Sequence, residues 1–168
     1  MRSFQSPLCR LLALSLASAA MLFSGTTIAR SPVPFKATIA VTELIHPVGA
    51  APCFLIGDIT GQGQATDLGK LTLVSRDCIN PIPTPTPEEQ AFSFFSNQVV
   101  LTAANGDQVF ATYTGVLIFE GAVGSINGGY LITGGTGRFS QATGAGTVRG
   151  LEDRTGTGQV ELKGNILY

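Results

Sequence analysis

Several residue types that support common activities are scarce in this sequence. The 168 residues include no tryptophan, two methionines and a single histidine, and charged residues make up only 12%. One histidine excludes a His-rich metal site and leaves no set of nucleophile, base and acid for hydrolysis. The formal net charge of -1 provides no basic surface for nucleic acid. Hydrophobic residues are abundant at 44%, which excludes a disordered chain, and 21 glycines with nine prolines favour strands and turns.

The N-terminal segment has the layout of a secretory signal peptide. Arg2 and Arg10 form a basic start, residues 11–23 form an apolar run, and small residues lead to Ala29. The run is shorter than the roughly 20 residues of a membrane span, although an uncleaved anchor is the alternative. We therefore expect residues 1–29 to be removed. Residues 30–168 then form one exported domain, secreted or periplasmic, with no stable membrane span.

Cysteine usage points to the same compartment. Only Cys53 and Cys78 remain after the signal peptide, and an even number in an exported chain predicts one disulfide. Such a bond closes a loop of about 25 residues, worth roughly 3 kcal/mol in the chain-entropy view. Two free thiols are the alternative.

The rest of the chain alternates apolar and polar residues with a period of two. In residues 35–46, Phe35, Ile39 and Val41 fall on one face, as in a half-buried strand. The other predicted strands are residues 53–60, 68–76, 92–103, 107–119, 130–133 with a start near residue 126, 142–151 and 159–168. A proline-rich segment, residues 80–90, is expected to form an extended surface loop.

Eight short strands without a convincing helix predict an all-β fold. We expect an eight-stranded antiparallel up-and-down barrel, because closure removes the exposed edges of the sheet. Glycines inside the strands suit the corners of a small barrel and favour it over a two-layer sandwich. The interior of such a barrel accommodates side chains or one small ligand.

Three stretches resemble a group of small exported bacterial proteins: residues 61–73, 104–115 and 130–148. In the first of them, Asp67 replaces a histidine that is common in the group. The turn at residues 134–139 (GGTGRF) is similar to the Gly-Gly-Thr-Gly turn of plant dirigent proteins and, more distantly, to the matching turn of allene oxide cyclases.

This resemblance implies an eight-stranded barrel with an apolar lumen open at one end, assembled as a trimer. Allene oxide cyclases hold a fatty-acid epoxide in the lumen, and dirigent proteins orient phenoxy radicals or quinone methides. Their catalytic residues have no counterparts that can be placed on this chain. The activity is therefore an analogy at the level of the fold.

Glu43 is the foremost candidate for chemistry. It falls in phase with Ile39, Val41 and Ile45, so its carboxyl group is expected on the core face, where burial raises a carboxyl pKa. A general acid or a polar anchor for a ligand fits that position. The alternatives are a head group that reaches water at the strand end, or an ion pair with Arg149, which is in phase with Thr147 and is expected in the lumen.

Tyr113 shares a phase with Val109 and Ala111 and is expected to contribute a hydroxyl to the lumen or simply to fill it. The candidate ligand-binding residues are thus Ile39, Val41, Glu43, Tyr113 and Arg149, with Glu43 and Tyr113 as weak catalytic candidates.

The sequence favours a small apolar ligand in the lumen, or a structural module, over catalysis, and it predicts no cofactor and no metal. A cyclase or isomerase, or a dirigent-like stereochemical guide for a hydrophobic substrate, is the alternative. A homo-oligomer is a third expectation, since residues 109–119 are apolar on both faces toward their end.

Overall fold

The computed structural model describes residues 30–86 and 88–168. The expected signal peptide, residues 1–29, lies outside the described residues. No helix in the described part of the chain is both long and apolar enough to cross a membrane.

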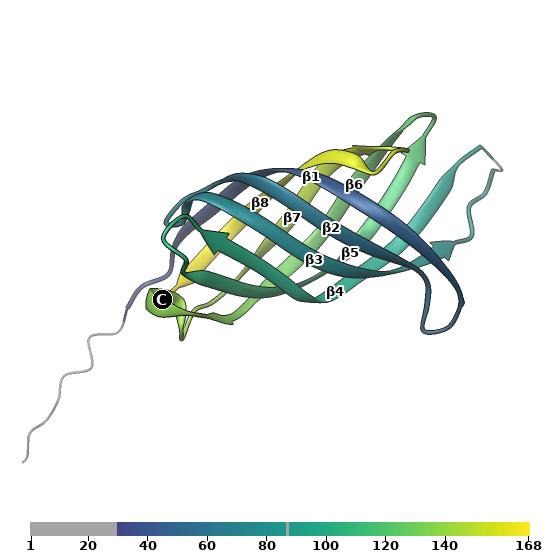
Figure 1. Cartoon of the computed structure of the whole chain (residues 1–168). Coiled ribbons are helices and arrows are strands. Elements are labelled where there is room, and N and C mark those ends of the chain that lie inside the picture. The colour runs from purple at the N-terminus through teal and green to yellow at the C-terminus, as the bar shows by residue number, and fades with distance from the viewer. Residues whose placement is uncertain (1–29, 87) are drawn as a thin grey trace, which may run out of the picture.

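Eight antiparallel strands close into a barrel in which each strand pairs with its neighbour in sequence and β1 pairs with β8 (Figure 1). The strands are β1 (Val33–Ala50), β2 (Cys53–Ala65), β3 (Gly69–Ile82), β4 (Gln90–Ala103), β5 (Gln108–Glu120), β6 (Val123–Gly135), β7 (Thr143–Asp153) and β8 (Thr157–Leu167). The predicted all-β, up-and-down barrel is confirmed. Closure pairs every strand on both sides, so no edge is left free.

Alternation along each strand separates a lumen face from a solvent face. In β1, Phe35, Ala37, Ile39, Val41 and Glu43 are buried, and the residues between them are exposed. Ile45 departs from the predicted pattern because it is 41% exposed. It lies beyond the packed part of the barrel, where β1 runs on toward its hairpin with β2.

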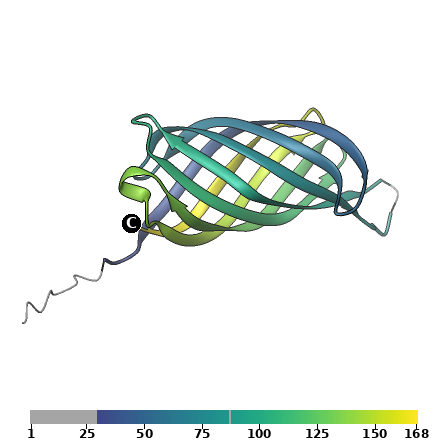
Figure 2. The ribbon, with the colours of Figure 1, turned by 60° about the horizontal axis from the view of Figure 1, so that its bottom comes forward.

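One end of the barrel is filled with side chains. The chain between β6 and β7 forms a short 3-10 helix, η1 (Gly137–Phe139), beside the C-terminus (Figure 2). Phe139 is fully buried there, together with Leu68 from the β2–β3 turn and Ala142. The Arg138 guanidinium lies 4.7 Å from the Phe139 ring centre, and its Nη2 donates a hydrogen bond to the Asp67 carbonyl. These contacts seal this end.

The opposite end carries the proline-rich connector and stays open. The predicted loop at residues 80–90 is shorter in the structure, because Pro81 and Ile82 still pair with Phe92 and Ala91 of β4. Proline cannot donate to a ladder, but Pro81 lies near the strand end, where this loss is tolerated. The connector therefore begins after Ile82 and ends before Gln90.

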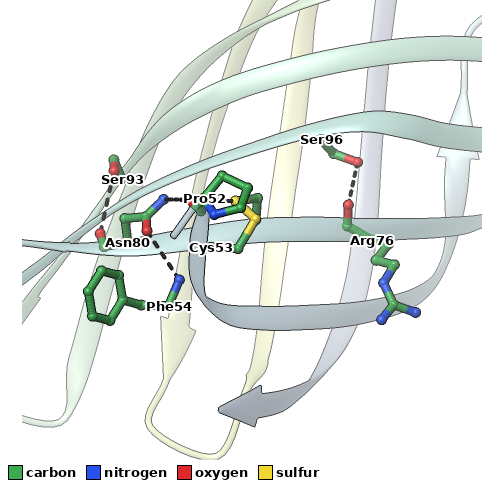
Figure 3. The surroundings of a disulfide bond; sticks show 8 residues. Pro52, Cys53, Phe54, Arg76, Asn80, Ser93 and Ser96 are labelled. Atoms are coloured by element: carbon green, nitrogen blue, oxygen red, sulfur yellow. Dashed lines mark hydrogen bonds between the residues drawn. A yellow bond between two sulfur atoms is a disulfide. The ribbon is translucent and has the colours of Figure 1, made fainter. Parts of the chain in front are cut away.

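Near this open end Cys53 and Cys78 form the predicted disulfide, with Cα atoms 5.1 Å apart (Figure 3). The Asn80 side chain supports the bridge from both sides. Its Nδ2 donates to the Pro52 carbonyl at 3.1 Å, and its Oδ1 accepts from the Phe54 amide at 3.2 Å. The bond thus ties the start of β2 to β3 at the rim.

Candidate ligand-binding cavity

A cavity of about 80 Å³ occupies the middle of the lumen, and all eight strands contribute to its wall. The wall is mainly apolar, with residues such as Phe35, Phe94, Leu101, Ile126 and Leu162. Toward the open end it adjoins an outer chamber of about 320 Å³. Both spaces share Glu43, Ile79, Phe92, Leu117 and Glu152, so these residues surround the passage between them.

Two carboxyl groups meet at this passage. Glu43 projects from β1 and Glu152 from β7, and each residue is 8% exposed. The Glu43 amide donates to the Gly156 carbonyl at 2.7 Å, which holds the β7–β8 turn against β1. Gly57 faces the Glu43 carboxyl, and a Cβ at that position would overlap it. A larger residue at this position of β2 would therefore displace the Glu43 head group.

The carboxyl groups of Glu43 and Glu152 influence each other's pKa. Burial, together with the nearby charges of Glu152 and Asp77, raises the pKa of Glu43 from 4.5 to about 8. Burial also raises the pKa of Glu152.

A second polar group lies on the neighbouring wall. Asp77 of β3 accepts a hydrogen bond from the Tyr113 hydroxyl, and Ser75 Oγ lies 2.9 Å from Asp77 Oδ1 and 3.0 Å from Ser96 Oγ. Ser96 in turn donates to the Arg76 carbonyl at 2.8 Å. Burial raises the pKa of Asp77 to about 6 against the lowering effect of the bonds from Tyr113 and Ser75. Burial and Asp77 together raise the pKa of Tyr113 beyond its usual range.

Tyr130 of β6 also lines the cavity, and its hydroxyl has no hydrogen-bond partner among the described residues. Its ring lies against Gly146 and Gly164, where added Cβ atoms would clash with it, and packs edge-on against Phe35 at a centroid distance of 6.2 Å. Burial raises the pKa of Tyr130 to about 12, so the hydroxyl stays protonated.

The structure brings together three of the five residues singled out in the sequence. Val41, Glu43 and Tyr113 line the cavity. Ile39 is fully buried in the core cluster but is not among the cavity-lining residues. Arg149 is exposed on the outer face, so the suggested placement in the lumen and ion pair with Glu43 are wrong.

The alternation of residues along β7 places Arg149 on the outer face. Thr143, Ala145 and Thr147 are exposed, and Arg149 continues their face. Val148 and Glu152 lie on the inward face instead.

The sequence interpretation missed Asp77 and its partners, although a signal was present. Leu71, Leu73 and Ser75 alternate in phase with Asp77, so the period of two places the carboxylate inside. The predicted strand ended at residue 76, directly before Asp77, whereas β3 continues to Ile82.

Glu152 was missed for the same reason, since the predicted seventh strand ended at residue 151. Ser96 has a weaker signal. The β4 register shifts between Ser96 and Val99, so simple alternation does not predict its orientation.

The remaining candidates lie outside the cavity. His46 is half exposed and pairs with Asp58 at 3.1 Å, and Arg76 Nη1 lies 3.5 Å from the same carboxylate. In residues 30–86 and 88–168, no group of three or more His, Cys, Asp or Glu side chains is placed to hold a metal ion.

Chemically, the cavity combines an apolar wall with proton-bearing oxygens at one end. Glu43 can give up a proton near neutral pH, and Asp77 with Tyr113 and Ser75 forms a fixed set of hydrogen-bonding groups. Comparisons with protein-family models, curated proteins and solved structures find no match to this chain.

Proposed function

We propose that this chain is an exported β-barrel that binds one small, mainly apolar ligand in its lumen, in the manner of allene oxide cyclase-like and dirigent-like barrels. The observation that carries the proposal is the cavity, which is walled by apolar side chains and has its polar groups gathered at the open end. Binding sites for small molecules commonly pair an apolar pocket with a few convergent polar groups.

The dimensions favour a slender occupant. The inner cavity of about 80 Å³ accepts a narrow chain, and the outer chamber of about 320 Å³ leaves room for a bulkier end. Each methylene group transferred from water to the wall contributes about 0.8 kcal/mol. The ligand's polar end is expected beside Glu43 and Glu152, because they surround the passage between the two spaces.

The test is a calorimetric titration of the purified protein with octanol, a neutral probe. Ala111 lines the cavity, whereas its neighbour Thr112 lies outside that wall, which gives a matched pair of variants. Ala111→Leu narrows the lumen and is expected to abolish binding, while Thr112→Leu leaves it intact. The proposal fails if the wild-type protein does not bind octanol, or if a folded Ala111→Leu protein binds it equally well.

A cyclase or isomerase is the second candidate, favoured by the position of Glu43 inside the cavity and the raised pKa that suits a general acid. Here the protein is incubated with an unsaturated fatty-acid epoxide, and the products are separated on a chiral column. The enzyme hypothesis is supported if the wild-type protein gives an excess of one product enantiomer and the Glu43→Gln protein, which still binds octanol, does not. A racemic product identical to that of the uncatalysed reaction excludes this activity.

A further inference from the structure

Asp77 is a buried carboxyl group with one engaged oxygen and one open oxygen. The residue is 3% exposed and lines the inner cavity. The Tyr113 hydroxyl donates to Oδ1, and Ser75 Oγ lies 2.9 Å from the same oxygen. Both contacts end on Oδ1, so among the described residues Oδ2 has no hydrogen-bond partner.

The open oxygen faces the cavity. Within residues 30–86 and 88–168, the Tyr130 hydroxyl is the one fully enclosed side-chain oxygen or nitrogen that lacks a partner. Asp77 Oδ2 therefore keeps some accessible surface, and the space that Asp77 lines is the lumen. A molecule in the cavity can reach this oxygen.

Neighbouring side chains hold this carboxyl group in a fixed direction. Ser75 Oγ lies 2.9 Å from the Tyr113 hydroxyl and 3.0 Å from Ser96 Oγ. Ser96 is anchored to the backbone, because it donates to the Arg76 carbonyl at 2.8 Å and accepts from the Gln98 amide at 3.2 Å. The open oxygen is thus oriented before any ligand binds.

A purely structural role does not explain the open oxygen. The contacts of Oδ1 join β3 to β5, and the carbonyl oxygen of an asparagine could accept the same bonds. They do not require a carboxylate. A buried acceptor that has lost its water and gained no partner is costly, and a hydrogen-bond donor on a ligand would remove that cost.

The neighbouring Glu43 narrows the chemistry of this donor. Glu43 lines the same cavity, and its pKa of about 8 leaves it largely protonated at neutral pH, so it offers an O–H group. Asp77, with a pKa of about 6, is mainly an acceptor at that pH, and it is close enough to raise the pKa of Glu43. A hydroxyl group both donates and accepts, whereas an ether or ketone oxygen only accepts and an ammonium group only donates. A hydroxyl group therefore matches both residues.

We propose that the ligand of the lumen is an apolar alcohol whose hydroxyl group donates to Asp77 Oδ2, and that Asp77 is the residue that selects for it. This proposal rests on the proposed function, because it assumes that the lumen binds an apolar molecule. It adds the polar group of that molecule and the residue that recognises it. Asp77 lines the inner cavity and not the outer chamber, so the hydroxyl group binds just inside the passage.

The experiment compares octanol with heptyl methyl ether by calorimetry at pH 7. The two probes are isomers of similar length, and only octanol has an O–H donor. Octanol is expected to bind at least about tenfold more tightly, since about 1.4 kcal/mol is near the lower end of what a hydrogen bond to a charged group contributes. Without that bond the ether should bind at least as tightly, because its oxygen is easier to remove from water.

A variant assigns the preference to Asp77. Asp77→Asn keeps an acceptor for Tyr113 and Ser75 but puts an NH₂ donor in place of Oδ2, so the preference for octanol should disappear. Asp58→Asn is the matched control, because Asp58 is a partly exposed carboxylate outside the cavity that pairs with His46. It should retain the tenfold preference.

If Asp77→Asn does not fold, the wild-type protein is titrated at pH 5 instead. Asp77 is then mostly protonated and offers its own donor, so octanol and the ether should bind about equally. The titratable groups that face Asp77 are Glu43, Glu152 and Tyr113. On the strands beside β3, Asp58 of β2 lies outside the cavity and β4 has no titratable residue. A preference that is unchanged at pH 5 overturns the proposal.

The outcomes separate this proposal from the proposed function. Octanol binding that is no tighter than binding of the ether overturns the alcohol and leaves the lumen site in place. A preference for octanol that persists in a folded Asp77→Asn protein overturns the role of Asp77. Failure of both probes to bind overturns both proposals.

Discussion

The raised pKa values in the lumen predict that the protein becomes less stable as the pH rises from mildly acidic to mildly alkaline. Glu43 has a pKa of about 8 in the folded protein against 4.5 in a solvated chain. The folded state therefore holds its proton more tightly than the unfolded state. The stabilisation is fully present below pH 4.5 and is lost as the pH rises through the folded pKa.

The magnitude follows from the size of the shift. Each pKa unit corresponds to about 1.36 kcal/mol, so the full shift of Glu43 amounts to about 5 kcal/mol between roughly pH 4.5 and 8. Asp77 adds to the loss with the same sign, because its pKa is raised from 3.8 to about 6. A loss of this size is a large fraction of the 5–15 kcal/mol that typically stabilises a folded domain.

The measurement is urea unfolding at a series of values from about pH 5 to pH 8, where the shift of Glu43 has its effect. The free energy of unfolding of the wild-type protein should fall by several kcal/mol over this range. Glu43→Gln should make the dependence shallower, because glutamine resembles the protonated acid and does not titrate, and the part of the loss that comes from Asp77 should remain. Glu161→Gln should retain the wild-type slope. A wild-type stability that is constant or increases over this range would refute the reasoning.

Three further predictions concern stability. Tyr130→Phe removes a buried hydroxyl that lacks a partner and should raise the free energy of unfolding by about 1–2 kcal/mol, measured by urea unfolding; a loss of stability would contradict this. Replacing Cys53 and Cys78 together with serine should cost about 3 kcal/mol, seen as a lower midpoint that a reducing agent reproduces in the wild-type protein. Phe139→Ala empties the sealed end and should cost about 3–5 kcal/mol; a thermal midpoint close to wild type would show that the end is not packed.

The fold could be predicted because it depends on a local pattern. Alternation in stretches such as residues 35–46 and 107–119 defines strands, and the turns at residues 105–106 and 134–137 define their ends. The cysteine count also predicted the disulfide. Strands and turns depend on neighbours in the sequence, and the disulfide followed from there being two cysteines after the expected signal peptide.

The candidate site was harder to predict because it depends on where strands end and how they twist. Asp77 and Glu152 each lie one residue past a predicted strand end, and both point inward. Arg149 was assigned to the wrong face, because alternation gives two faces but does not say which of them is inside when both carry small residues. Glu43 and Glu152 are far apart in the sequence. They come together because β1 pairs with β8 to close the barrel, which also brings the β7–β8 turn to β1.

Export, the signal peptide and the trimer stay predictions. On the outer face of β5, Phe110, Val116 and Ile118 are half-buried in the single chain. Sedimentation of the purified protein tests the trimer, and a monomer would exclude it.

The plug formed by η1 and Leu68 has a consequence for traffic through the barrel. Because this end is closed, a molecule cannot pass through the barrel from one end to the other, so the lumen is a pocket and not a channel. Whatever leaves must use the route by which it entered, past Glu43 and Glu152. Binding and release therefore use the same entrance, and one ligand must dissociate before another can bind.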